Sequence, residues 1–219
     1  MNNRFDMTVA YAMHDALRRE SHFLARVIAR VDPDPRNVLR NAAGWNLFRR
    51  ALHAHQAAED EVLWPSLRQA LCGRPFFLAR LEALEAEHAA LAGVLEVIDQ
   101  ALADPDVGLE LLGELAGSLV TGLRGHLCHE EETVFPVVQV ILSKDQWQRF
   151  ERVHAQLIES DAARILPWLL DGATERTVAA VLAQLLPESA HPAYTNQWQP
   201  AYARLDRWGT GDALADMPT

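Results

Sequence analysis

Two stretches of this sequence repeat one pattern. The first is His55-Gln56-Ala57-Ala58-Glu59-Asp60-Glu61-Val62-Leu63-Trp64-Pro65, and the second is His126-Leu127-Cys128-His129-Glu130-Glu131-Glu132-Thr133-Val134-Phe135-Pro136. In both, a glutamate follows the histidine by four residues, and an aromatic residue and a proline end the stretch. Each stretch is also preceded by a further histidine, in the matching segments His14-Asp15-Ala16-Leu17 and His88-Ala89-Ala90-Leu91. The chain therefore contains two copies of one helical hairpin.

The spacing within each copy has a direct structural meaning. Residues i and i+4 of a helix lie one above the other, so His55 and Glu59 point the same way, as do His126 and Glu130. Burying two ionised glutamates without a counter-charge costs several kcal/mol each, and no Lys or Arg occupies a neighbouring inward position. Two metal ions would supply that charge. Imidazole with carboxylate, and without thiolate, suits non-haem iron or manganese better than a structural zinc site.

A competing pattern is present. Glu85-x-x-His88 and Glu151-x-x-His154 have the spacing seen in ferritin-like di-iron bundles. That interpretation leaves the doubled His-x-x-x-Glu pattern unexplained, so we rank it lower. His154 is then expected on the polar face of its helix.

Almost every long stretch has helical periodicity, and none alternates as a strand does. Four long helices are expected at about 6–31, 37–71, 76–103 and 108–142, ended by segments rich in Pro, Gly and Asp. A fifth helix, opened by a capping box at Ser143, should reach about residue 170, and a sixth should span 175–186. The residues from 187 onward are expected to be irregular.

Short connections between long helices are typical of an all-α, up-down-up-down four-helix bundle. We therefore divide the chain into the bundle, residues 1–142, and a C-terminal helical extension packed on it, residues 143–219. The aromatic residues of the extension are expected to pack its helices or to form the contact of a homodimer.

Composition narrows the class of protein. The chain has 219 residues, 49% of them hydrophobic, and a formal net charge of -10, which disfavours nucleic acid and anionic lipid as partners. The two cysteines, Cys72 and Cys128, form no Cys-x-x-Cys pair, so a disulfide scaffold and a Cys-rich zinc module are excluded. Neither a membrane-spanning apolar run nor an apolar secretion signal is found. We expect a cytoplasmic protein without a membrane partner.

Residues 6–142 resemble the hemerythrin-like family of His-His-Glu cation-binding domains, on the repeated motif and on its aromatic–proline endings. The resemblance implies a pair of iron ions, bridged by an oxo or hydroxo group inside a four-helix bundle, with manganese or zinc as substitutes. It also implies terminal imidazole ligands and bridging carboxylates. The metal ligands that it assigns are His14, His55, His88 and His126 as terminal ligands and Glu59 and Glu130 as bridges.

One ligand of the oxygen-carrying hemerythrins is absent. They place a second histidine one turn from the third-helix ligand, whereas Leu84 and Ala92 stand four residues before and after His88 here. About two of about twelve coordination positions would then stay open. Open positions favour reaction with a small molecule over reversible storage. His129 and Glu87 are the two residues that could fill the gap instead.

These observations favour a non-haem di-iron protein that binds or reacts with a small oxidant: dioxygen, hydrogen peroxide or nitric oxide. Catalase- or peroxidase-like turnover is one form of this hypothesis, and the sequence leaves open whether the protein is an enzyme. The alternatives are an iron- or oxygen-responsive regulatory or interaction module, and iron buffering. The remaining acidic residues near the motif are expected to form a solvated face; these are Asp15, Asp60, Glu131 and Glu132.

Overall fold

The computed structural model describes residues 5–29, 34–40, 42–104 and 106–209. Within these ranges every regular element is a helix, which confirms the all-helical class. The elements before residue 143 are α1 (Thr8–Ile28), α2 (Pro35–Leu39), α3 (Ala43–Ala58), the π-helical segment η1 (Glu59–Leu63), α4 (Trp64–Ala70), α5 (Pro75–Ala103), α6 (Leu109–His129), the π-helical segment η2 (Glu130–Val134) and α7 (Phe135–Ile141). Those after it are α8 (Lys144–Glu159), α9 (Ala162–Leu169), α10 (Glu175–Leu185), the 3-10 segment η3 (Glu188–Ala190), α11 (His191–Ala193), the π-helical segment η4 (Tyr194–Trp198) and α12 (Gln199–Ala203).

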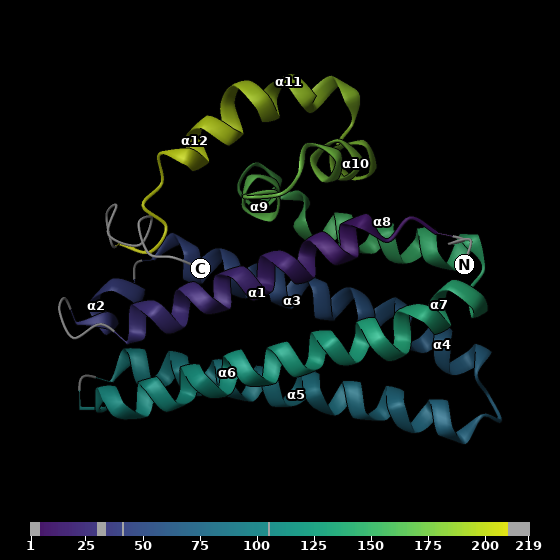
Figure 1. The fold of residues 1–219 in the computed structure, drawn as a ribbon, viewed down its shortest axis with the longest axis horizontal. Helices are drawn as coiled ribbons and strands as arrows, with labels where there is room; N and C mark the ends of the chain where they lie inside the picture. The colour runs from purple at the N-terminus through teal and green to yellow at the C-terminus, as the bar shows by residue number, and fades with distance from the viewer. Residues whose placement is uncertain (1–4, 30–33, 41, 105, 210–219) are drawn as a thin grey trace.

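Four long helical segments lie side by side: α1, α3 with η1 and α4, α5, and α6 with η2 and α7 (Figure 1). Helix α6 packs against both α1 and α5, and α1 packs against α3. Helices α8 to α12 lie over one side of this group, where α8 contacts α3 and η1, and α9 and α10 contact α1. In the described part of the chain, no helix has both the length and the apolar character needed to cross a membrane.

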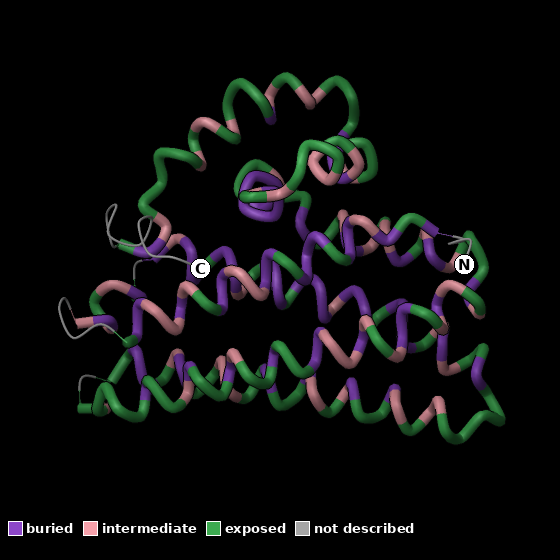
Figure 2. Tube along the Cα trace, viewed as in Figure 1, coloured by how far each residue is buried: buried purple, intermediate pink, exposed green. Residues whose placement is uncertain are grey.

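The core joins the long helices to the C-terminal ones. Buried residues line the faces that the helices turn toward one another, and the outer faces of α5 and α6 are largely exposed (Figure 2). One apolar cluster contains Leu17 of α1 and Phe48 of α3 together with Trp168, Tyr194 and Trp208 from the C-terminal region. The aromatic residues of that region therefore pack its helices, as the sequence predicted.

The helix boundaries differ from the sequence prediction in four places, one of which is the helix expected over 108–142, which is divided into α6, η2 and α7. The helix expected over 37–71 is divided into α2, α3, η1 and α4, and the one expected over 143–170 is divided into α8 and α9. The region from 187 onward is helical as far as Ala203 rather than irregular, because η4 and α12 pack on α9. The end expected for the first helix, at residues 30–31, lies outside the described residues.

Caps, turns and the bounds of α5 agree better with the sequence prediction. The capping box is present: the Gln146 N–H donates to Ser143 Oγ at 3.2 Å, and the Ser143 N–H donates to Gln146 Oε1 at 2.9 Å. The turn after α9 contains Gly172 with φ of 74°, a conformation that glycine adopts at little cost. Helix α5 also begins and ends within a residue of its prediction.

A buried carboxylate on α1 fastens the end of the described chain to the long helices. Glu20 Oε1 accepts hydrogen bonds from Arg19 and Arg207, both at 2.9 Å, and its Oε2 accepts one from the Trp208 indole at 3.0 Å. The N–H of Gly44 in α3 donates to the carbonyl of Arg207 at 2.7 Å. Arg207 and Trp208 thus close against two of the long helices.

Gly44 gives a test of this closure. A methyl group at this position would lie 2.6 Å from Trp208 Cε2 and 3.0 Å from the Arg207 carbonyl oxygen. Gly44→Ala should therefore lower the free energy of unfolding by about 1–3 kcal/mol through overpacking, although alanine is the better helix former. Urea unfolding measures the change. The control is Gly117→Ala on α6, where a methyl group meets nothing within 4 Å and should stabilise the helix by up to about 1 kcal/mol. Stabilisation by both substitutions would contradict the close contact with Trp208.

Candidate metal centre

Both glutamates of the repeated motif begin a π-helical segment. Glu59 opens η1 and Glu130 opens η2, and in each case the residue after the segment donates its N–H to the glutamate carbonyl five residues back. Pro65 and Pro136 follow one residue later. Proline lacks an N–H and clashes with the carbonyl four residues before it, so the wider turn accommodates it. Such π turns are uncommon and occur frequently at functional sites.

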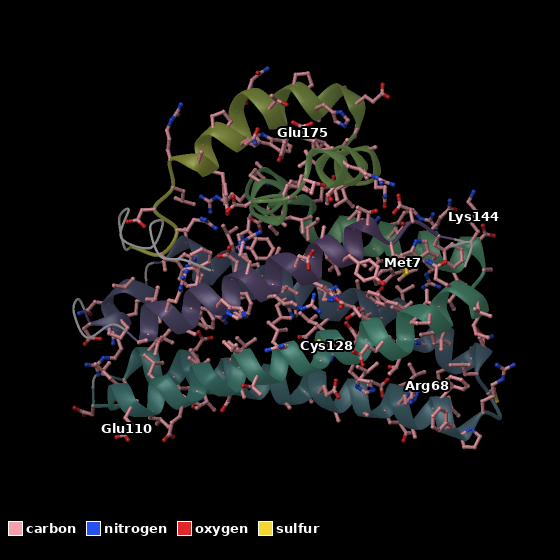
Figure 3. All side chains as sticks on the ribbon, viewed as in Figure 1. Met7, Arg68, Glu110, Cys128, Lys144 and Glu175 are labelled. Atoms are coloured by element: carbon pink, nitrogen blue, oxygen red, sulfur yellow. The ribbon has the colours of Figure 1, made fainter. Side chains whose placement is uncertain are left out.

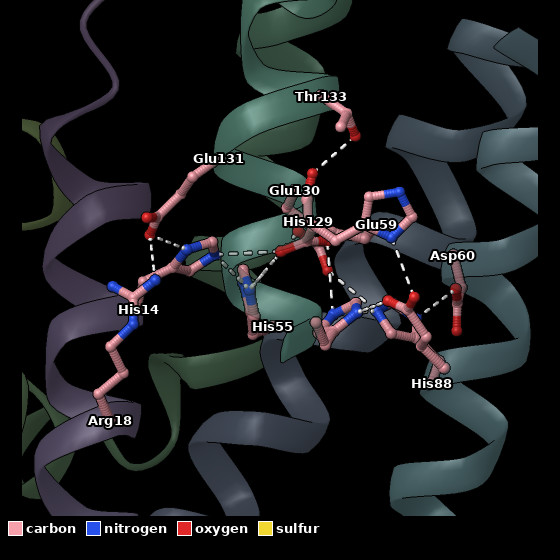
Figure 4. A network of polar contacts seen from close by, with 12 residues as sticks. His14, Arg18, His55, Glu59, Asp60, His88, His129, Glu130, Glu131 and Thr133 are labelled. Atoms are coloured by element: carbon pink, nitrogen blue, oxygen red, sulfur yellow. Dashed lines mark hydrogen bonds and ion pairs between the residues drawn. The ribbon is translucent and has the colours of Figure 1, made fainter. Parts of the chain in front are cut away.

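The four histidines of the motif form two pairs in the interior. Nε2 of His14 lies 3.1 Å from Nε2 of His55, and Nε2 of His88 lies 3.0 Å from Nε2 of His126. The pairs come from α1 with α3 and from α5 with α6, so each hairpin of the repeat supplies one pair (Figure 4). All four side chains are buried.

The two glutamates lie between the histidine pairs and reach both. Glu59 Oε1 is 3.5 Å from His55 Nε2, and its Oε2 is 3.5 Å from His88 Nε2. Glu130 contacts the other histidine of each pair: its Oε2 is 3.2 Å from His14 Nε2, and its Oε1 is 3.5 Å from His126 Nε2. Each carboxylate therefore faces one imidazole from each hairpin.

The residues fit a pair of cations. All four oxygens of Glu59 and Glu130 are buried, and none has a hydrogen-bond partner in the described part of the chain, which is costly for a carboxylate. The ligand atoms form two groups of four, each with its atoms within 4.8 Å of one another: His14, His55, Glu59 and Glu130, and His88, His126, Glu59 and Glu130. Both groups share both carboxylates. They could hold two metal ions bridged by the glutamates, and imidazole with carboxylate suits iron and manganese.

The protein by itself disfavours two ionised carboxylates at this place. Burial, together with the charge of Glu130, raises the pKa of Glu59 well above its usual value. Burial also acts to raise the pKa of Glu130, but the short contact with His14 and the charge of His126 outweigh it and lower that pKa. Burial lowers the pKa of His55 well below its usual value, so its imidazole is neutral. Cations between the carboxylates would allow both to be ionised.

Two acidic residues expected on a solvated face instead support histidines. Glu131 Oε1 accepts from His14 Nδ1 at 2.7 Å and from Arg18 at 2.7 Å, and Asp60 Oδ1 accepts from His88 Nδ1 at 2.9 Å (Figure 4). The prediction was wrong for Glu131, which is half-buried, whereas Asp60 is exposed as expected and still accepts from His88. The residue after an inward glutamate lies further round the helix, toward the neighbouring helix. Each carboxylate supports a histidine of the other hairpin. The other two acidic residues, Asp15 and Glu132, are exposed as expected.

His129 and Glu87 do not join either group of ligand atoms. Glu87 Oε1 accepts from His129 Nδ1, and its Oε2 accepts from His126 Nδ1, both at 2.9 Å. Glu87 therefore supports His126 from outside. A proton held on Nδ1 by a carboxylate leaves the Nε2 lone pair directed at the interior, where a metal would need it.

His55 differs from the other three histidines. It pairs with carboxylates only through Nε2 among the described residues, and the ring of His154 lies 6.0 Å from its ring, centre to centre. His154 is only 3% exposed, its Nε2 has no hydrogen-bond partner, and burial lowers its pKa to about 4. The prediction that it lies on a polar face was wrong, because Phe150, His154 and Ile158 form the buried side of α8.

Cys128 and Cys72 take no part in either ligand group. Cys128 lies on α6 between two of the motif residues (Figure 3). It is only half-buried, and Cys72 is exposed. Neither cysteine belongs to the groups of ligand atoms found in the described chain. The donor set is therefore nitrogen and oxygen, without sulfur.

The fold and the centre together define an all-helical protein with a candidate two-cation site made of histidine and glutamate. The family model of the hemerythrin HHE cation binding domain matches residues 9–138, more than half of the chain. The chain therefore belongs to this family, as the resemblance of its sequence predicted. No match was found among curated proteins or among solved structures.

The unpartnered carboxylates give a test that does not need metal. In metal-free protein at neutral pH, Glu59→Gln should raise the free energy of unfolding by about 1 kcal/mol or more, because it removes a buried ionisable group that repels Glu130. Urea unfolding after chelation measures this. Glu61→Gln, at an exposed position of the same π segment, should change stability by less than about 0.5 kcal/mol. A loss of stability in Glu59→Gln would show that the carboxylate is favourably bound by the protein alone.

Proposed function

We propose that the protein is a non-haem di-iron protein that binds or reduces a small oxidant: dioxygen, hydrogen peroxide or nitric oxide. The observation that supports this proposal is the pair of buried carboxylates, unpartnered and shared by two groups of ligand atoms. The long helices would form the up-down-up-down four-helix bundle of the family within residues 1–142. Residues 143–219 would form the C-terminal extension.

Each residue of the centre has a distinct role in this proposal. His14 and His55 would be the terminal ligands of one ion, and the other histidine pair would hold the second. Glu59 and Glu130 would bridge the two. Manganese and zinc are the alternative ions for the same donors.

The remaining residues prepare the site for this chemistry. Two iron ions would supply the electrons that reduce the oxidant. The chain keeps three of the four imidazoles oriented through Asp60, Glu87 and Glu131, which hold protons on their Nδ1 atoms. The ring of Phe135 stacks 5.2 Å from that of His14 and limits the access of water from that side. Because every inner side chain is buried, the site suits an oxidant with two non-hydrogen atoms and disfavours larger substrates.

The position of the missing family ligand favours reaction over reversible binding. Leu84 is fully buried and packs in a cluster with Trp64 and Phe135, whereas Ala92 is exposed. Position 84 is therefore the one of the two that faces the interior, and a leucine there offers no donor atom. The ion beside His88 would keep an open coordination position.

Metal analysis tests the assignment of the ligands. Protein from iron-supplemented cells should contain about two iron ions per chain and absorb in the near ultraviolet when oxidised. Glu130→Ala should lose most of both ions, because each glutamate reaches both sites, whereas His14→Ala should retain about one ion. Glu61→Ala is the exposed control and should retain both. A single tightly bound zinc, or full iron retention in Glu130→Ala, would refute the proposal.

A second test adds the missing donor. Leu84→His should slow the oxidation of the reduced protein by air at least about tenfold, because an imidazole would occupy an open position. Stopped-flow absorbance of protein reduced without oxygen, then mixed with oxygenated buffer, gives the rate. Ala92→His places the same side chain at the exposed position and should leave the rate unchanged. Equal rates in the two variants would show that coordination at this position does not limit reactivity.

A further inference from the structure

A cavity lies on the side of His55 that faces the C-terminal helices. Its volume is about 320 Å³, and residues of α1, α3, α8 and α10 line it. This volume is at the lower end of the range of small-molecule sites. The cavity is separate from the space between the glutamates, since neither Glu59 nor Glu130 is among the residues that line it.

The lining changes in character from the surface inward. At the outer end lie Gln184 and Arg152, which are exposed. At the inner end lie Trp147, Phe150 and His154, which are all buried. A solute could therefore enter between α8 and α10 and reach an aromatic interior.

The inner end contains one unused polar group. The Trp147 indole N–H donates to Glu151 Oε1 at 2.9 Å, so the tryptophan presents only its apolar surface. The rings of Phe150 and His154 are parallel within 4°, with centres 6.2 Å apart. His154 Nε2 is buried without a partner, and a buried polar atom normally has one. A ligand with a hydrogen-bonding group would satisfy it.

We propose that this cavity binds a small, uncharged aromatic molecule with a hydroxyl or similar group, anchored by His154 and enclosed by Trp147 and Phe150. The aromatic walls favour a flat ring. A charged ligand would lose its hydration at this buried aromatic end, which is costly, and the Glu151 carboxylate beside it already accepts from Trp147. The proposal concerns the cavity alone and does not depend on the identity of the metal ions.

Phenol and toluene are suitable probes because they share a ring and differ in one hydroxyl. Isothermal titration calorimetry on the full chain as purified should show saturable binding of phenol at one site, about three- to tenfold tighter than that of toluene. His154→Phe keeps the ring and removes the nitrogen, so it should abolish the preference for phenol. His53→Phe makes the same exchange at an exposed histidine and should preserve the preference.

A second variant tests the place of binding. Ala155 lines the cavity, and Ala155→Phe should fill it and weaken the binding of both probes at least about tenfold. Gln156→Phe places the same side chain at the next, exposed position of α8 and should have no effect. No saturable binding to the wild type would overturn the proposal. So would unchanged binding in Ala155→Phe, or a preference for phenol that survives in His154→Phe.

Iron content separates this proposal from the function proposed above. Repeating the titration after chelation should leave phenol binding intact. Binding of phenol by a chain that takes up no iron would refute only the di-iron function. Uptake of two iron ions by a chain that binds no phenol would refute only the cavity proposal.

Discussion

Two carboxylates stand in the middle of a helical assembly with no hydrogen-bond donor for any of their four oxygens among the described residues. A pair of apolar residues of similar size would be cheaper to bury. Glu59 and Glu130 are therefore explained by what they can bind rather than by what they contribute to folding. The surrounding structure fits this constraint: four imidazoles face the carboxylates, and three outer carboxylates each hold one of these imidazoles. Two apolar clusters surround them.

The parts of this arrangement that could be predicted from sequence are those that depend on neighbouring residues. Helical periodicity, the capping box at Ser143 and the His-x-x-x-Glu spacing each involve residues within one or two turns. The repeat allowed one contact between distant segments to be predicted, because matching offsets in the two hairpins indicate that their candidate ligands lie together. The six residues that the resemblance assigned do lie together, although their role as ligands stays a prediction.

The parts that were missed depend on contacts between distant segments. His14 and Glu131 are 117 residues apart, and Glu20 and Trp208 are 188 residues apart. No local pattern distinguishes such a pair from two surface residues. The prediction for His154 was wrong for a different reason: its spacing of four residues from both Phe150 and Ile158 already places it on the apolar side of α8. Only the contact of its ring with His55 depends on the packing of α8 on α3. The π-helical segments were not predicted either, because the helix before the wider turn and the helix after it each show ordinary α-helical periodicity.

The support of the histidines has a consequence for how the two hairpins depend on each other. Asp60 belongs to the first hairpin but supports His88 of the second, and Glu131 belongs to the second but supports His14 of the first. A single hairpin of this kind would contain only one of the two shared glutamates and would lack the carboxylate that supports the histidine of its first helix. It could complete the centre only by pairing with a second copy across a twofold axis. The two halves of the polypeptide are thus related as the two subunits of a fused homodimer would be. A substitution in one half could therefore be compensated by a substitution in the other half.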